Sequence, residues 1–284
     1  MAGFKSFADL AKAQDEGRVY SGHFSKTAGA SASNVWQWID LSMGTGNPMA
    51  QYYAASPLEA AALVGRRGIY HGDDKTPYKK FLTGISLTAT SANMIGKYLL
   101  ADYLLFYPFI DGTSLDEQQM VNDVTLPRYA SEGGKVIAVA TAALTANAYF
   151  DMRYINQDGV ERSTGYVNRL AGPSAIGNVA NASAALADGS FPYLRLYGGD
   201  TGVRSISSIT LQSAPGGLIA FAIIKPLQMA QFLDANNTTE KQFPFGMPAT
   251  PEILDGAYLN FLASTAAAAS ALSVTGRLDF AWSK

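Results

Sequence analysis

The sequence contains no cysteine, only two histidines and few charged residues among its 284 positions. The lack of cysteine excludes disulfide bonds, thiolate metal sites and cysteine nucleophiles. The two imidazoles, His23 and His71, leave little for histidine-based catalysis. Charged residues make up 15% of the chain, against about 25% in ordinary soluble domains. The surface must therefore be covered by small uncharged residues, which suits contact with other proteins.

The charge balance and the lack of long apolar runs exclude further classes of partner. The formal net charge is −2, which gives no general attraction to nucleic acid or to an anionic membrane. The longest apolar stretch, residues 98–110, contains Asp102 and Pro108 and falls short of the roughly 18 residues of a membrane-spanning helix. The first residues lack the pattern of a signal peptide. We expect no nucleic-acid or membrane partner, and synthesis in the cytoplasm.

Recognisable catalytic motifs are missing as well. The chain has no His-Glu-x-x-His zinc motif, no Walker loop and no Gly-x-Ser-x-Gly nucleophile elbow. The Gly-Thr-Gly segment at 44–46 lacks the third glycine and the following helix that dinucleotide binding needs. His71 beside Asp73 and Asp74 suggests either a metal site or, more simply, a polar loop. We expect no enzyme activity, no cofactor and no metal site.

Apolar and polar residues alternate in several segments, which is typical of half-buried β-strands. The four segments with this pattern are 81–90, 148–167, 205–225 and 272–282. Turn residues at 156–159 and 214–217 predict that the second and third segments are β-hairpins. Hairpins without regularly alternating helices predict a mainly β fold, with antiparallel sheets packed as a sandwich or jelly roll.

Three details of these segments predict local features. Ile206 and Ile209 are out of phase across two serines, which predicts a β-bulge. Pro226 has no N–H to donate to a neighbouring strand, so we expect it to end the strand. Gly276 falls among the apolar positions of the last segment, where it marks a bend or a close approach of the backbone.

The N-terminal part reads differently. Phe4, Phe7 and Leu10 recur at helical spacing before Gly17, which predicts one short amphipathic helix. This helix packs either on its own domain or on a neighbouring molecule. An isolated short helix is marginal in water, so it needs a surface to pack on.

Residues 18–57 are interpreted as an extended, irregular region. Around Trp36 and Trp38 both alternating faces are apolar, as in a strand covered on both sides or an arm lying in a groove. We divide the chain into residues 1–68, a helix with an extended arm, and residues 69–284, the sandwich body. The predicted partner-binding residues are Phe4, Phe7, Leu10, Trp36 and Trp38.

Six short segments, spread over most of the chain, carry a family resemblance. They are Asp40-Leu-Ser-Met-Gly-Thr-Gly-Asn-Pro48, Tyr103-Leu-Leu-Phe-Tyr-Pro-Phe109, Thr125-Leu-Pro-Arg-Tyr129, Tyr154-Ile-Asn-Gln-Asp-Gly159, Gly199-Asp-Thr-Gly202 and Asp255-Gly-Ala-Tyr-Leu-Asn260. Together they resemble structural proteins of tailed-bacteriophage virions, of the kind found among head proteins. The resemblance implies a β-rich, non-enzymatic component of the particle, and it includes no catalytic or metal motif.

On this resemblance we expect a capsid decoration or cement protein on the surface of the virion. It would form a homo-oligomer, such as a trimer, and bind the major capsid protein or other virion proteins. Contacts repeated on several neighbours give avidity. Two alternatives stay open. One is a structural component of the head–tail junction, tail or baseplate. The other is a glycan- or receptor-binding module that uses loop tyrosines and Trp36 or Trp38 for stacking.

Overall fold

The fold is described from a computed structural model of the chain. The described residues are 4, 6–28, 35–55, 59–65, 67–89, 94–181, 191–232, 234, 238–242, 250–266 and 273–284. Within them the chain forms one α-helix, a 3-10 turn and three antiparallel sheets. The predicted class, a mainly β protein with antiparallel sheets packed as a sandwich and a short N-terminal helix, is confirmed.

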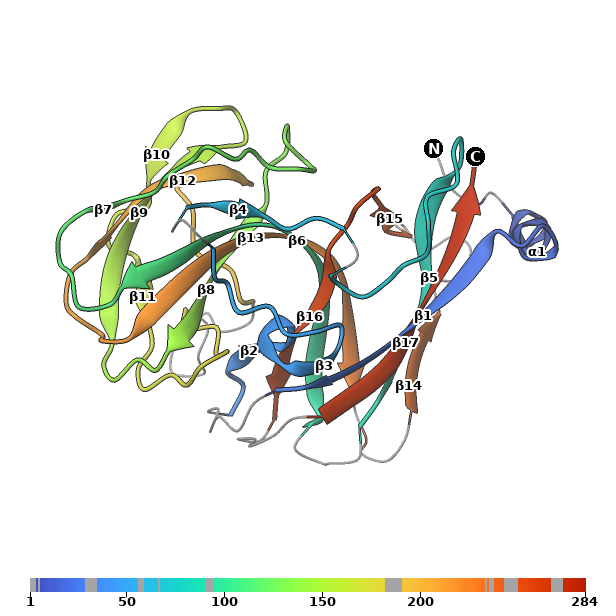
Figure 1. The fold of residues 1–284 in the computed structure, drawn as a ribbon, viewed down its shortest axis with the longest axis horizontal. Coiled ribbons are helices and arrows are strands. Elements are labelled where there is room, and N and C mark those ends of the chain that lie inside the picture. Colours follow the sequence, from blue (N-terminus) through green and yellow to red (C-terminus); the bar gives the residue numbers. More distant parts are fainter. Residues whose placement is uncertain are drawn as a thin grey trace.

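Sheet A lies at one end of the molecule (Figure 1). Its strands, in spatial order, are β14 (Thr238–Gln242), β5 (Lys79–Thr88), β17 (Ser273–Ser283), β1 (Val19–Thr27) and β3 (Thr45–Asn47). The short strand β15 (Glu252–Ile253) also pairs with β5. The first and last long strands of the chain, β1 and β17, therefore lie side by side along nine paired positions.

Sheets B and C complete the fold. Sheet B has the order β2 (Trp38–Asp40), β16 (Leu259–Thr265), β6 (Gly96–Asp111), β13 (Leu218–Phe232) and β8 (Lys135–Ala142), with β4 (Ala61–Ala62) also paired to β6. Sheet C has the order β10 (Glu161–Ser163), β9 (Ala148–Asn156), β12 (Val203–Leu211) and β7 (Gln118–Gln119), with β11 (Asn168–Leu170) also paired to β9.

Two hydrophobic cores lie along the same long strands of sheet B. Strands β6 and β13, of 16 and 15 residues, run through the centre of the molecule (Figure 1). Toward sheet A, Tyr98 and Phe232 of these strands pack in one cluster with Leu278 of β17. Toward sheet C, Phe221 packs in a second cluster with Phe150 of β9. The two sandwiches therefore share one central sheet.

A third core covers other side chains of sheet B and holds a buried ion pair beside it. The cluster includes Trp38, Leu99 and Ala222. Next to it, Arg128 donates two hydrogen bonds of 2.7 Å to the carboxylate of Asp102. Their side chains are 5% and 1% exposed. Such a pair is favourable only when its remaining polar groups are also bonded.

The partners of this ion pair join distant parts of the chain. The Arg128 guanidinium also donates to the carbonyls of Leu63 and Tyr103, at 2.9 and 3.0 Å. Asp102 accepts a further bond from the backbone N–H of Tyr258 at 2.8 Å. The pair thus fastens the segments around residues 63, 103, 128 and 258 to one another.

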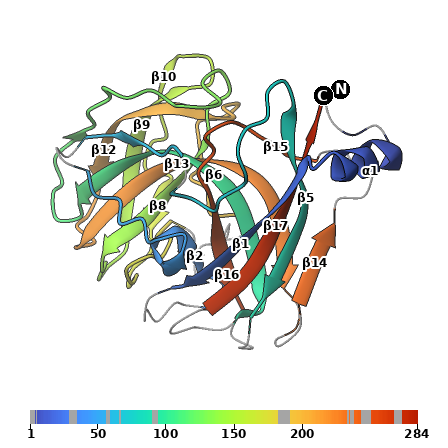
Figure 2. The same cartoon turned by 45° about the vertical axis from the view of Figure 1, so that its right-hand side comes forward.

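The predicted short helix is present as α1 (Phe7–Asp15), outside sheet A beside β17 (Figure 2). Ser6 begins the helix, because its hydroxyl accepts a hydrogen bond from the N–H of Asp9. Gly17 follows the helix with a left-handed φ of 66°, as a C-terminal glycine commonly does. Ala13 is buried, so the helix rests on its own subunit.

In the described part of residues 18–57, three strands belong to the sheets. Strand β1 is flanked by β17 and β3, while β2 pairs with β16. The prediction of extended structure is correct here, but these strands do not form a free arm in the subunit. The division of the chain at residue 68 stays a prediction, and strand pairs of both sheet A and sheet B cross it.

One predicted hairpin is confirmed and the other is wrong. Strands β9 and β10 pair around the turn at 156–159, where Gly159 has a φ of 79°. By contrast, β12 pairs with β9 and β7 in sheet C, whereas β13 pairs with β6 and β8 in sheet B. The turn at 214–217 therefore carries the chain from one sheet to the other. An alternating pattern shows that one face is buried, but not which strand lies alongside.

Of the three local predictions, those for the β-bulge and for Gly276 are confirmed, and the one for Pro226 is wrong. The bulge is confirmed by a register shift between Ile206 and Ser208. The prediction that Pro226 ends its strand is wrong, since β13 continues to Phe232. A register shift just after Pro226 accommodates the missing donor within the strand. At Gly276 a close approach is confirmed, because a Cβ atom there would lie 2.3 Å from the Ser86 carbonyl oxygen.

Candidate partner-binding site

The two predicted tryptophans have different environments. Trp38 is fully buried in the third core, in the same cluster as Tyr53 and Leu262. It is therefore corrected from a contact residue to a core residue, because a strand covered on both faces leaves its side chain no solvent. The Trp36 side chain is exposed, with 43% of the residue's surface accessible. The backbone N–H of Trp36 donates to the carbonyl of Thr265 at 2.7 Å. Of the two, only Trp36 offers surface to a partner or a sugar ring.

The three predicted residues of the N-terminal segment lie together at the outer side of sheet A. Phe4 and Leu10 are half-buried, and the Phe4 ring lies edge-on to Phe81, with 6.2 Å between centroids. Phe7 is 69% exposed. Because α1 and β2 lie in different parts of the molecule (Figures 1 and 2), the structure does not bring Trp36 together with these residues. Their role in binding stays a prediction.

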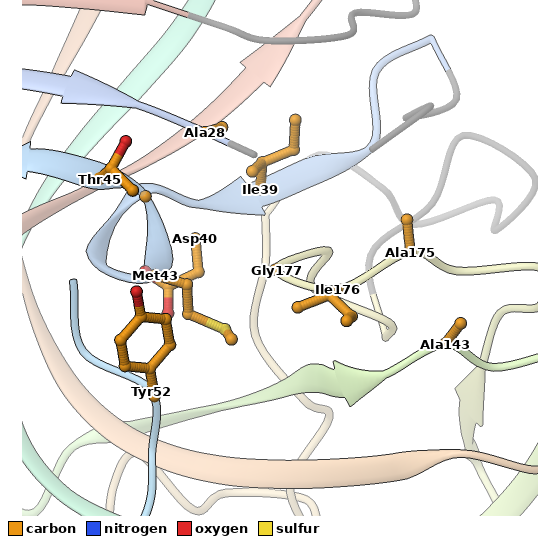
Figure 3. A pocket seen from close by; sticks show the side chains of 11 residues that line it. Ala28, Ile39, Asp40, Met43, Thr45, Tyr52, Ala143, Ala175, Ile176 and Gly177 are labelled. Atoms are coloured by element: carbon orange, nitrogen blue, oxygen red, sulfur yellow. The ribbon is translucent and has the colours of Figure 1, made fainter. Parts of the chain in front are cut away.

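Beside β2 the surface contains an apolar pocket of about 490 Å³, here called the β2 pocket. Figure 3 shows Ile39, Met43 and Ile176 around the hollow, with Tyr52 at one side. Ile176 is 54% exposed, and Tyr52 is also exposed. The pocket therefore offers apolar side chains to solvent from both of its walls.

Hydrogen bonds between β2 and the segment 174–179 build one wall of the pocket. The N–H of Asp40 donates to the Gly177 carbonyl, and the N–H of Val179 donates to the Trp38 carbonyl, both at 2.8 Å. The Gln37 side-chain amide donates to the Ser174 hydroxyl at 3.1 Å. These contacts place exposed Trp36 and exposed Ile176 on neighbouring segments.

The opposite wall is stabilised by the buried carboxylate of Asp40. It accepts hydrogen bonds from the hydroxyls of Tyr103 and Ser42, both at 2.8 Å, and from the hydroxyl of Tyr53. The N–H of Ser42 adds a fourth bond at 2.9 Å, which begins the 3-10 turn η1 (Leu41–Met43). Burial raises the pKa of Asp40, and these hydrogen bonds oppose the rise. The network holds Met43 at the pocket.

Buried Lys26 stabilises the loop of residues 42–48, which follows β2. Its ammonium donates to the carbonyls of Gly44 at 2.6 Å, Pro48 at 2.9 Å and Ser42 at 3.4 Å. Burial lowers the pKa of Lys26 to about 8, and the nearby Asp40 charge opposes this. Three carbonyls fixed by one cation leave the loop little freedom, so a ligand would not have to order it.

His71 belongs to a separate polar cluster, not to this pocket. Its Nδ1 atom lies 2.8 Å from the ammonium of buried Lys80, and its Nε2 atom lies 3.0 Å from the Ala257 carbonyl. Nε2 therefore carries the hydrogen and Nδ1 accepts from Lys80. Lys80 also donates to Asp74 at 2.8 Å. Because an ammonium occupies Nδ1, the polar-loop interpretation fits this histidine better than the metal-site one.

In the described part of the chain, no three His, Asp or Glu side chains gather in a way suited to a metal ion. Within the same residues, no helix has the length and apolar character to cross a membrane. The chemistry of the β2 pocket is apolar contact against a rigid wall. It suits the apolar side chains of a protein partner better than a reaction.

None of the five predicted contact residues lines the β2 pocket. The predicted contact residue Trp36 precedes β2 but does not line the pocket, and the lining residues Met43 and Ile176 are not among the predicted contacts. The available signal for Ile176 was a single large apolar residue inside a stretch of Gly, Pro, Ser and Ala. Such a residue has little chance of reaching a core from a turn-rich loop, so it is a candidate for exposed apolar surface.

Comparisons with known proteins give little. No protein-family model matches the sequence, and no curated protein matches it. Among solved structures, one match is to the chain of T=1 particles derived from infectious bursal virus. The match spans 93% of this chain and 78% of that chain, with 10% sequence identity and a TM-score of 0.16. A second match, to the VP2 subviral particle of infectious bursal disease virus, spans 93% of this chain and 80% of that chain, with 9% sequence identity and a TM-score of 0.17. Scores this low carry no argument about fold or function.

Proposed function

We propose that this chain is a structural protein of a tailed-bacteriophage virion, and specifically a decoration protein that binds the major capsid lattice. The observation that carries the proposal is the resemblance of six segments, from Asp40 to Asn260, to virion structural proteins. The fold is compatible with this role, because its antiparallel sheets present surface on many sides.

Two exposed apolar surfaces support a bridging role. One is the β2 pocket with Ile176, next to the exposed Trp36 that precedes β2 in the chain, and the other is α1 with Phe7. They lie in different parts of the molecule (Figure 1), so each can contact a different neighbour. Simultaneous contacts raise the overall affinity well above that of either contact alone. The remaining surface carries few charges, which limits the desolvation cost of assembly.

Copy number in the particle tests the proposal directly. A three-dimensional reconstruction of the virion should place this chain over the capsid lattice, at a stoichiometry that follows the number of major capsid subunits. A single ring at one vertex would instead indicate a head–tail or tail component. Absence from purified particles would contradict both structural roles.

The substitution Ile176→Asp is expected to weaken binding to capsids that lack this protein by about tenfold or more. A carboxylate in the β2 pocket would have to lose its hydration when the apolar contact forms, which weakens binding. A tenfold loss of affinity corresponds to about 1.4 kcal/mol. Because Ile176 is 54% exposed, the melting temperature should stay close to that of the unaltered protein. Co-sedimentation with capsids measures the binding.

Val167→Asp is the matched control for this test. Val167 is 52% exposed and lies in the turn before β11, away from the β2 pocket. It should leave capsid binding unchanged. Equal binding by the two variants and the unaltered protein would show that the β2 pocket is not the contact surface.

Removal of residues 1–16 is expected to leave the three sheets folded and to weaken capsid binding. Within residues 1–16, Ala13 is buried and Phe4 contacts Phe81, whereas Phe7 is 69% exposed. Phe7→Ser should therefore weaken binding while changing the free energy of unfolding by less than about 0.5 kcal/mol. Thermal melting and co-sedimentation separate the two effects. A sharp loss of stability with unchanged binding per folded molecule would show that α1 is only part of the core.

A glycan- or receptor-binding module remains the second candidate. The observation in its favour is an exposed aromatic on a loop: the Tyr197 ring faces solvent, with the Arg162 guanidinium 5.3 Å from its centre. A planar ring beside a cation suits stacking on a sugar. Binding on a glycan array that is lost in Tyr197→Ala, with no association with capsids, would favour this function.

A further inference from the structure

A second pocket, of about 600 Å³, opens between sheets B and C and is here called the lysine pocket. Four separate segments form it: residues 131–135 up to the first residue of β8, Gln157 after β9, Thr201 before β12, and Lys225 with Pro226 in β13. It shares no lining residue with the β2 pocket.

Two lysine side chains line this pocket. The Lys135 ammonium donates to the Thr201 carbonyl at 2.8 Å. Lys225 forms an ion pair with Glu132, whose side chain is 63% exposed. An ammonium has three N–H donors, so these contacts use only part of the donor capacity of each lysine. Lys135 pairs with Ile224, the residue next to Lys225, so the two lysines lie on adjacent strands. Burial lowers the pKa of Lys135, and the charge of Lys225 lowers it further.

Arg204 adds a third positive charge behind the lining. Its Nη2 donates to the carbonyl of Ser131 at 3.3 Å and to that of Gln157. Its Nε is buried and has no hydrogen-bond partner among the described residues. The lining itself carries two ammonium groups and the carboxylate of Glu132, while outside the lining the Asp158 carboxylate accepts a hydrogen bond from the Gln157 side-chain amide at 2.8 Å.

The walls of the lysine pocket are fixed before any ligand arrives. The Gln157 side-chain oxygen accepts from the N–H groups of Thr201 and Gly202 at 2.9 and 3.2 Å. At the start of the 131–135 loop, Tyr129 has a left-handed φ of 56°. Its carbonyl accepts from the N–H of Gly133 at 2.8 Å. Backbone strain in a non-glycine residue persists where the surrounding structure holds it, and it gathers at functional sites.

We propose that the lysine pocket binds a compact, multiply charged oxyanion, with phosphate or carboxylate groups contacting Lys135 and Lys225. Partly buried cations that repel each other gain when an anion lies between them, and charge-assisted hydrogen bonds to an oxyanion are among the stronger ones. The lysines supply the primary donors, while Arg204 adds long-range attraction. This site is independent of the capsid contact proposed above.

The test uses isothermal titration of the full chain with two probes, pyrophosphate and citrate, at constant ionic strength set with sodium chloride. Saturable binding of at least one probe is expected. Binding of pyrophosphate alone would assign the site to phosphate groups, and binding of citrate alone would assign it to carboxylates. If neither probe binds saturably, the proposal is wrong.

Three variants assign the binding to this pocket. The double variant Lys135→Gln with Lys225→Gln should lower the affinity for the probe at least tenfold. Lys12→Gln with Lys79→Gln removes the same charge from the helix and from β5, and it should weaken binding less than twofold. Glu132→Gln should tighten binding several-fold, because it removes the competing carboxylate from Lys225. Equal weakening by the two double variants would reduce the effect to net charge and overturn the site.

Discussion

Arg128→Met is expected to lower the free energy of unfolding by about 3–5 kcal/mol, as the loss of one partner from a buried ion pair does. Asp102 is 1% exposed and would keep its carboxylate in the core without its cation. Burial already raises the pKa of Asp102, and Arg128 opposes that rise. The Leu63 and Tyr103 carbonyls would lose their bonds to the guanidinium as well. Urea denaturation at pH 7 measures the change.

Two further variants separate this pair from ion pairs in general. Arg128→Met combined with Asp102→Leu should recover part of the lost stability, because it removes the unpaired charge. Lys79→Met breaks the exposed pair of Lys79 with Glu252, at 2.9 Å. It should cost less than about 1 kcal/mol. A similar cost for Arg128→Met and Lys79→Met would contradict the central role assigned to the buried pair.

Acidification is expected to remove about 3 kcal/mol of stability through His71 alone. Burial, followed by the charge of Lys80, lowers the pKa of His71 from 6.5 to about 4. In the unfolded chain this histidine binds a proton below about pH 6.5, whereas in the folded protein it stays neutral until about pH 4. The unfolded state therefore binds more protons across that window. The contribution is complete above pH 6.5 and is lost as the pH falls toward 4.

His71→Asn tests this dependence, because the Asn side-chain oxygen can take the place of Nδ1 as the acceptor for Lys80. The free energy of unfolding should fall less steeply between pH 6.5 and pH 4 in this variant than in the unaltered protein. His23→Asn is the control, since His23 is exposed on β1 and lies outside the cluster. If His71→Asn and the unaltered protein have parallel curves over this range, the linkage to His71 is wrong.

The sequence predicts the strands well and their neighbours poorly. Alternation finds the segments that become β5, β9, β12, β13 and β17, because one face of each strand is buried. The pairing of β12 with β9, and not with β13, depends on contacts between residues far apart in the chain. A turn such as 214–217 looks the same whether it closes a hairpin or crosses between sheets. Local patterns do not distinguish these cases.

The candidate sites depend on such long-range contacts even more strongly. Trp36 and Trp38 look equivalent in sequence, yet Trp36 is exposed and Trp38 is buried in the third core. Lys26 and Asp40 carry no recognisable motif, because their roles come from the carbonyls and hydroxyls that the fold places around them. The lysine pocket likewise gathers residues from four segments. Among the regions predicted to contact a partner, only the N-terminal helix is a local element whose structure follows from neighbouring residues, because it has its own start and stop signals.

The sharing of β6 and β13 between both sandwiches makes the molecule one thermodynamic unit. Neither half can melt while the other keeps its core, since each core takes side chains from the same two strands. A ligand held at one end therefore stabilises the opposite end by the same free energy. Amide hydrogens in the middle of β9, far from α1, then exchange through opening of the whole chain. A neighbour bound only at α1 slows their exchange without touching sheet C.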